Sequence, residues 1–311
     1  MRGPTFAAIS LPGAAVLLAG LVHAPGAGAQ APAPPPPPPP PPAVEIAEID
    51  TPREEAMVDV GGRRLHCVRY GKGAPTVVLI SGFRAPQVYW NPVVPALAAA
   101  ATVVTYDRPG YGKSELGEAP NHGLQAAADL HRLLEAIGTP KPYVVVGHSY
   151  GGRIARLFAA TYPDAVGALL LEEAGHEDTL DEQLKALEGP DHEQLVTMSA
   201  GFRQRPASPR TEAEYMLDTI EQLRTSPPLP RVPLVVLAAK DGGGLPPVFS
   251  AQGQAKVREV SAAMQRRLAA LVPGGRLIEV PGVGHNIHVE KPEAVLEPLL
   301  ALVAQAKGGA R

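Results

Sequence analysis

The chain has 311 residues, of which 45% are hydrophobic, and its 28 lysines and arginines face 31 aspartates and glutamates. A net charge of −3 and no block of lysine or arginine give no support for a nucleic-acid or anionic-membrane surface, so we expect no nucleic-acid partner. The single cysteine, Cys67, excludes an intrachain disulfide, and the stability of the fold must come from its core.

The first 43 residues are expected to lie outside the folded domain. Arg2 precedes an apolar stretch that ends in a small-residue site, Ala27-Gly28-Ala29, which is typical of a secretory signal peptide over 1–29. The proline run within 30–43 predicts a stiff polyproline II linker. We therefore expect a secreted or periplasmic protein with no membrane span after signal removal. An uncleaved N-terminal membrane anchor is the alternative.

Residues 44–311 predict one large domain in which strands and helices alternate. A hairpin around Gly61-Gly62 opens it, with strands at 57–60 and 65–70. The further strands are expected at 76–80, 102–106, 143–146, 168–171, 232–238 and 276–280, and the helices at 90–100, 125–137, 150–162, 251–271 and 292–304. Apolar strands that alternate with helices indicate a mostly parallel, doubly wound α/β sheet with helices on both faces.

The alternation of strands and helices fails between about residues 174 and 230. Charged helical segments replace it, broken by glycine and proline. We interpret this region as an inserted helical lid, and its many acidic residues as solvated helix faces rather than a cation pocket.

The pentapeptide Gly147-His148-Ser149-Tyr150-Gly151 lies between an expected strand and an expected helix. A nucleophile elbow needs this setting, because its serine occupies a strained turn and the flanking glycines let neighbouring backbone pass closely. The pattern therefore predicts that Ser149 is the reactive residue.

Several separated motifs make the chain resemble the α/β-hydrolase superfamily from about residue 56 to 304. In the family's order, they are Ser81-Gly82-Phe83, Asp107-Arg108-Pro109-Gly110-Tyr111-Gly112-Lys113-Ser114, the elbow, Gly284-His285-Asn286 and Glu290-Lys291-Pro292-Glu293. The resemblance implies the α/β-hydrolase fold and a serine hydrolase with no cofactor and no metal.

The resemblance also implies the residues of a catalytic triad. His285 would take the proton of Ser149, and Asp241, which follows the strand expected at 232–238, would hold the imidazole. Glu173 is the alternative acid, because some family members carry theirs after the preceding strand. Metal binding by His285 and His288 is a less favoured interpretation.

The backbone N–H groups of Phe83 and Tyr150 are the candidate oxyanion hole. Ser81 stands where many family members have histidine, so the loop before Phe83 departs from the common pattern.

Taken together, the patterns predict an exported carboxylic ester hydrolase that acts on a small-molecule acyl substrate through an acyl-enzyme on Ser149. The same triad supports C–C bond hydrolysis, cyanohydrin cleavage or peroxy-acid formation, and the fold does not choose among them. A non-catalytic hydrolase-fold binding module is the alternative from another class. The oligomeric state is left open.

Overall fold

The computed structural model describes residues 46–118, 120–200, 211–241 and 248–309. The expected signal peptide (1–29) and proline-rich linker (30–43) lie outside the described residues. The chain divides into two units, 1–48 and 49–311, and the architecture that follows is that of the second unit.

An eight-stranded, mostly parallel sheet forms the centre of this unit, in the order β1-β2-β4-β3-β5-β6-β7-β8. The expected opening hairpin is present, and the β1–β2 and β2–β4 pairs are antiparallel, whereas the others are parallel. The strands are β1 Arg53–Asp59, β2 Arg64–Tyr70, β3 Thr76–Ile80, β4 Thr102–Tyr106, β5 Tyr143–His148, β6 Val166–Glu172, β7 Leu234–Ala239 and β8 Arg276–Val280.

Helices connect the parallel strands close to the positions that the sequence predicts. They are η1 Gln87–Trp90, α1 Val94–Ala98, α2 Gly123–Ala136, α3 Tyr150–Thr161, η2 Pro163–Ala165, α4 Thr179–Ala186, α5 Gly189–Ala200, α6 Met216–Thr225, α7 Ala251–Ala269, α8 Ile287–Glu290 and α9 Pro292–Gly309. The expectation of one helix over 90–100 is wrong: a 3₁₀ turn and a short α1 stand there. Pro95 is consistent with the break, because it lies in the first turn of α1, where a proline without an N–H is tolerated best.

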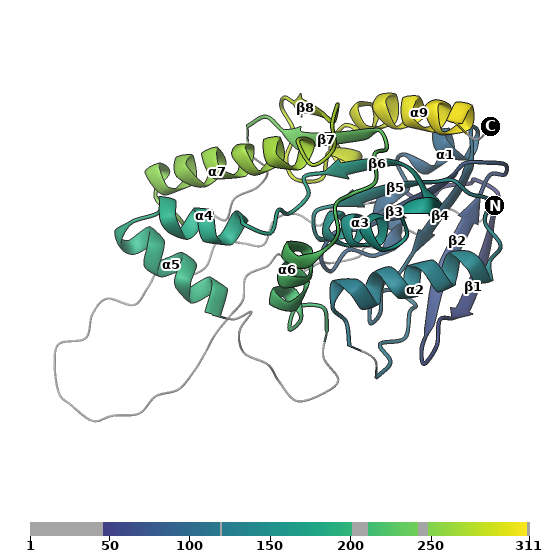
Figure 1. Ribbon diagram of the computed structural model, residues 1–311, viewed down its shortest axis with the longest axis horizontal. Helices are drawn as coiled ribbons and strands as arrows, with labels where there is room; N and C mark the ends of the chain where they lie inside the picture. Colours follow the sequence, from purple (N-terminus) through teal and green to yellow (C-terminus); the bar gives the residue numbers. More distant parts are fainter. Residues whose placement is uncertain (1–45, 119, 201–210, 242–247, 310–311) are drawn as a thin grey trace, which may run out of the picture. The chain divides into compact units, whose positions relative to one another are not determined.

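The two faces of the sheet carry separate hydrophobic cores. Val78 and Ile80 of β3 pack in one core with side chains of α2, α3 and α7, whereas Val77 and Leu79 pack in the other core with α1 and α9. Figure 1 shows α2 and α3 on one side of the sheet and α1 and α9 on the other. Strands buried on both faces explain why their sequences are apolar throughout rather than alternating.

Three helices, α4, α5 and α6, lie between β6 and β7 in the chain, within the expected insertion at 174–230. We call them the α4–α6 insertion. Thr219 of α6 accepts a hydrogen bond from Gly123 N at the start of α2 and lies 3.2 Å from the hydroxyl of Tyr150 at the start of α3. Helix α6 of the insertion therefore packs beside the start of α3, and the function of the insertion as a lid stays a prediction.

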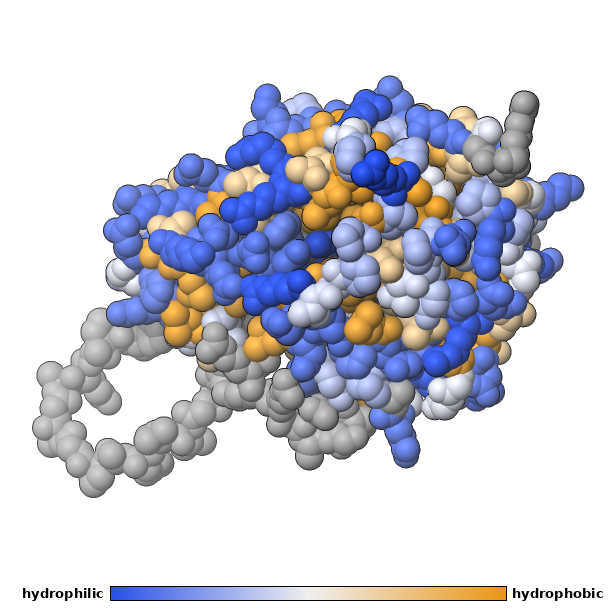
Figure 2. Space-filling view, in the orientation of Figure 1, coloured by the Kyte–Doolittle hydropathy of each residue, from blue (hydrophilic) through white to orange (hydrophobic). Residues whose placement is uncertain are grey.

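Large hydrophobic side chains that are exposed fall on several different elements rather than on one. They are Met57, Leu124, Val196, Met198, Val248 and Leu271. On the face drawn in Figure 2, hydrophobic areas are likewise separated by hydrophilic residues. Within the described ranges, every helix is too short or too polar to cross a membrane.

Candidate active site

The candidate residues gather at the carboxyl ends of the central parallel strands. Ser149 follows β5, Glu173 follows β6, and His285 lies in the loop after β8. The sheet order reverses between β3 and β5, and ligands of open α/β sheets bind in the crevice outside the strand ends at such a point.

Ser149 stands in a strained turn between β5 and α3. Its backbone has φ 53° and ψ −116°, a conformation that side-chain-bearing residues rarely adopt. The turn is held from both sides, since Ser149 N donates to Glu172 O at 2.9 Å and Ser149 O accepts from Gly152 N at 3.1 Å. The side chain is partly exposed, so its hydroxyl is presented at the start of α3.

The glycines of the elbow are needed because backbone crowds them. A Cβ at residue 147 would lie 2.5 Å from Gly151 O, and a Cβ at residue 151 would lie 2.3 Å from Ile80 O. A Cβ at residue 152 would lie 2.4 Å from the Cβ of Ala174. The start of α3 therefore approaches β3, β5 and the loop after β6 more closely than any side chain would permit.

The loop that carries Phe83 lies against the elbow. A Cβ at residue 82 would be 3.3 Å from the Cβ of Ser149, and the rings of Phe83 and Tyr150 meet edge to face with centroids 6.2 Å apart. The guanidinium of Arg108 donates to Ser81 O at 2.6 Å and to Gly82 O at 2.7 Å. The backbone that leads to Phe83 N is thus fixed next to Ser149.

Arg108 is itself held by a buried ion pair. Its Nε donates to Glu212 Oε2 at 2.8 Å and its Nη2 to Glu212 Oε1 at 2.9 Å. Both side chains are almost completely buried, so each charge depends on the other. Glu212 therefore links the segment before α6 to the loop beside Ser149.

The acid that contacts His285 is Glu173. His285 Nδ1 lies 3.2 Å from Glu173 Oε2, and Glu173 Oε1 accepts from Ala239 N at 2.8 Å. Glu173 N donates to Leu237 O at 2.8 Å, and the residue has a φ of 45°. Both ends of Glu173 are therefore anchored to β7, which aims one carboxylate oxygen at the imidazole.

Asp241, the acid that the sequence favours over Glu173, has a different contact from Glu173 in the structure. Asp241 is exposed, and its carboxylate accepts a hydrogen bond from Gly282 N at 3.2 Å in the turn after β8. The contact with His285 comes instead from the residue directly after β6, the strand next to β5. Asp241 thus has the turn-stabilising role that its glycine-rich surroundings also suggest.

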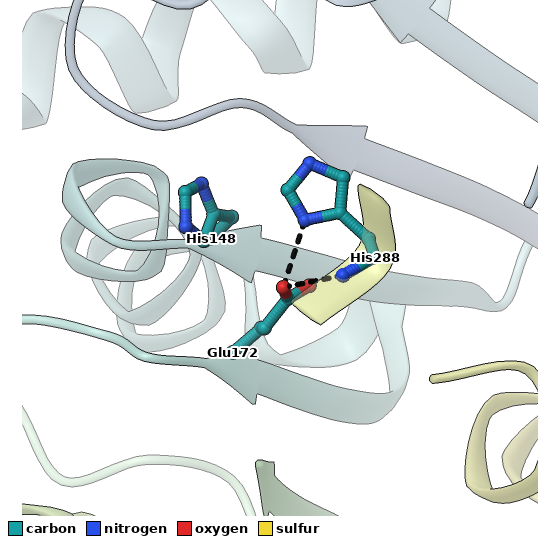
Figure 3. Close-up of side chains that lie close together, drawn as sticks. All are labelled: His148, Glu172 and His288. Atoms are coloured by element: carbon teal, nitrogen blue, oxygen red, sulfur yellow. Dashed lines mark hydrogen bonds and ion pairs between the residues drawn. The ribbon is translucent and has the colours of Figure 1, made fainter. Parts of the chain in front are cut away.

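A second carboxylate–histidine pair lies beneath the loop of His285. Glu172 Oε1 accepts from His288 N at 2.9 Å and lies 2.7 Å from His288 Nδ1, as Figure 3 shows. The Trp90 ring covers His288, with centroids 4.2 Å apart. Glu172 and His288 are both fully buried, and they tie the short helix α8 to the end of β6.

His148, Glu172 and His288 form a group of three metal-ligating side chains in the described part of the chain, with one ligand atom of each within 4.8 Å of the others. A tetrahedral zinc ion holds its ligand atoms only about 3.4 Å apart, since its bonds are about 2.1 Å long. Glu172 Oε1 already contacts two nitrogen atoms of His288. We interpret the group as the hydrogen-bonded support of the His285 loop.

His148, at the end of β5, contacts this loop directly. Burial lowers the pKa of His148 well below its usual value, and His285 and His288 add to the shift. The neutral imidazole carries one N–H, and because Nε2 lies 2.9 Å from His285 O, that N–H donates to the carbonyl. His148 thus attaches the backbone of His285 to the residue before Ser149.

The structure therefore brings together most of the residues that the sequence predicts. The start of α3 is surrounded by Ser149, the Phe83 loop, Tyr150 and His285. Glu173 contacts His285, whereas Asp241 contacts Gly282. The pairs Glu172–His288 and Arg108–Glu212 were not anticipated, because 116 and 104 residues separate their members. The paired acids at the end of β6 are the one signal that pointed toward this region.

Comparison with known proteins relates this chain to a family. Residues 77–297 match the model of the alpha/beta hydrolase family. The uncharacterized protein YqjL of Bacillus subtilis (strain 168) is 34% identical over 107 residues, which are 34% of this chain and 42% of YqjL. The Escherichia coli O1:K1 / APEC protein named "Putative carbamate hydrolase RutD" is 39% identical over 98 residues, 31% of this chain and 36% of RutD.

The curated relatives share only part of their length with this chain, which spans about a fifth to two fifths of them. Among solved structures, the enol-lactonase of Burkholderia xenovorans LB400 is similar with a TM-score of 0.56 and 20% identity. The match covers 80% of this chain and all of the lactonase chain. At this identity, the likeness concerns the fold.

We expect Gly147→Ala to destabilise the protein by about 1–3 kcal/mol, because the new Cβ meets backbone atoms that cannot move aside. Gly308→Ala is the matched control, since a Cβ there meets nothing within 4 Å. Urea unfolding of both variants measures the difference. Equal losses of stability would contradict the packing argument.

Acid should weaken the fold through His148. Its pKa is lowered in the folded protein, so below about pH 6.5 the unfolded chain binds a proton that the folded chain does not. The free energy of unfolding should fall with decreasing pH, by at most about 1.4 kcal/mol per pH unit for this residue. In His148→Asn, urea unfolding between pH 7 and 5 should show a shallower decline, and an unchanged slope would contradict this origin.

Proposed function

Because the chain belongs to the alpha/beta hydrolase family, a family of hydrolases, we propose that it is a serine hydrolase of carboxylic esters. The observation that carries the proposal is the contact of His285 Nδ1 with Glu173 Oε2 in a loop tied to the residue before Ser149. A free hydroxyl is a weak nucleophile at neutral pH and needs such a held imidazole as its base.

In the proposed reaction, Nε2 of His285 takes the proton of Ser149 while Oγ attacks the acyl carbon. The tetrahedral intermediate expels the alcohol, which leaves with the proton from His285. Water then attacks the acyl-enzyme, gives a proton to His285 and releases the acid, and the proton returns to Ser149 Oγ. Glu173 holds the Nδ1–H tautomer throughout and stabilises the imidazolium.

The oxyanion of each intermediate needs donors that are already oriented. Tyr150 N stands at the first residue of α3, where the helix dipole favours negative charge. Phe83 N follows the two carbonyls that Arg108 holds. We assign these two N–H groups to the oxyanion hole, and the buried Arg108–Glu212 pair to holding the second one in place.

A serine-reactive probe tests the nucleophile. A fluorophosphonate should label Ser149 with one equivalent per chain, and Ser149→Ala should lose both labelling and hydrolysis of p-nitrophenyl esters. Ser226→Ala is the control, since that hydroxyl donates to Leu223 O on α6 and should be dispensable. Folded protein that resists labelling at high probe concentration would refute the acyl-enzyme.

Two conservative variants test the acid. Glu173→Gln keeps the shape but loses the charge that holds the imidazole, so kcat should fall by about 10²- to 10⁴-fold. Asp241→Asn should change kcat little, because its carboxylate contacts Gly282 N. Rates of p-nitrophenyl ester hydrolysis, with thermal melting to check folding, decide between the two. A large loss in Asp241→Asn alone would reverse the assignment.

A further inference from the structure

Buried arginines in this protein come with a carboxylate. Arg63 pairs with Asp129, Arg108 pairs with Glu212, and Arg156 pairs with Glu177 through two hydrogen bonds of 2.6 and 3.0 Å. Such pairing is expected, because a guanidinium removed from water needs a compensating charge.

Arg153 on α3 departs from this pattern. Its Nε is buried without a hydrogen-bond partner, and its Nη1 donates to the sulfur of Met216 at 2.7 Å. Among the described residues, every Asp and Glu oxygen lies beyond ion-pair distance of Arg153. Of the segments outside the described residues, 119, 201–210 and 242–247 contain no Asp or Glu.

The neighbours of Arg153 add to the uncompensated charge. Arg156, one turn further along α3, already uses both oxygens of the nearby Glu177. The carboxylate of Glu177 is therefore taken by Arg156 and is not paired with Arg153. Burial lowers the pKa of Arg153, and the proximity of Arg156 lowers it further.

The position of Arg153 relates this charge to the proposed nucleophile. Arg153 follows Ser149 by four residues, which is about 6 Å along the helix axis and on the same face. Long side chains on a helix lean toward its N-terminus, which here is the elbow. Arg153 is partly exposed as a residue, although its Nε is buried.

The loop after Glu173 packs closely against the guanidinium of Arg153. A Cβ at residue 175 would lie 2.8 Å from both Nε and Nη2 of Arg153, and glycine stands there. Gly175 N donates a hydrogen bond to Ser149 O at 3.3 Å. The edge of the guanidinium that has no carboxylate therefore faces the backbone next to the nucleophile.

We propose that Arg153 is the anion-binding residue of the substrate site and takes the carboxylate of a substrate that is a half-ester of a dicarboxylic acid. This inference rests on the proposed function, since it places that carboxylate about one helical turn from the ester carbon. A guanidinium donates to a carboxylate through charge-assisted hydrogen bonds, and the bound substrate offsets the buried charge.

Kinetics on a matched substrate pair test the preference. Arg153→Met should raise KM for mono-p-nitrophenyl glutarate by roughly 10- to 100-fold, because a hydrogen bond to a charged group is lost. The KM for neutral p-nitrophenyl pentanoate should stay nearly unchanged. The KM of Arg153→Lys for mono-p-nitrophenyl glutarate should lie between the values of the wild type and Arg153→Met. Arg231→Met is the charge-matched control, since Arg231 is exposed on the loop before β7.

Binding without turnover separates this inference from the proposed function. In the full chain carrying Ser149→Ala, calorimetry should detect glutarate binding, and adding Arg153→Met should abolish it, whereas adding Arg231→Met should not. If the wild-type protein neither hydrolyses esters nor takes the serine probe, yet glutarate binding still needs Arg153, the proposed function fails and the anion site stands.

Two results would overturn the anion site. One is the absence of glutarate binding to the Ser149→Ala protein, and the other is an equal loss of activity on both esters in Arg153→Met. Melting temperatures show whether each variant is folded. We expect Arg153→Met to melt no lower than the wild type, because the substitution removes an unpaired buried charge. If Arg153→Met does not fold, Arg153→Gln takes its place in both experiments with the same expected results.

Discussion

The close approach of α3 to the sheet is the constraint on which the site depends. Gly147, Gly151 and Gly152 let backbone atoms of β3, β5 and α3 come within distances that a Cβ would prevent. This contact forces Ser149 into its positive-φ turn and presents its side chain at the edge of the sheet. Every other group of the site is placed relative to that turn.

The two acids at the end of β6 have different roles: one holds the backbone of the site in place, and the other contacts the proposed catalytic histidine. Glu172 is the last residue of β6, whereas Glu173 follows it with a φ of 45°, and their side chains reach different partners. Glu172 is fully buried and ties down α8, whereas Glu173 reaches His285. The loop of His285 is thereby attached to β6 through both acids and to β5 through His148.

Local sequence patterns predict the strands and helices of the scaffold. Contacts between residues that are distant in sequence could not be predicted from them. Apolar runs fixed the strands and their parallel pairing, and motif order located Ser149 and His285. The choice between Asp241 and Glu173 depended on side-chain reach and on a positive φ at Glu173, which no pattern encodes. Pro95 is a local signal against one continuous helix over 90–100, because proline has no N–H.

Buried charge distinguishes the parts of the site that hold it together from the part that meets a ligand. Arg108 and Glu212 compensate each other's buried charge, and Arg108 orients the Phe83 loop. Within the described part of the chain, Arg153 has no carboxylate partner, and we expect its charge to lower the stability of the free protein. A fold that retains an unpaired charge beside a reactive residue gives up stability for binding, because the missing half of the pair arrives with the ligand.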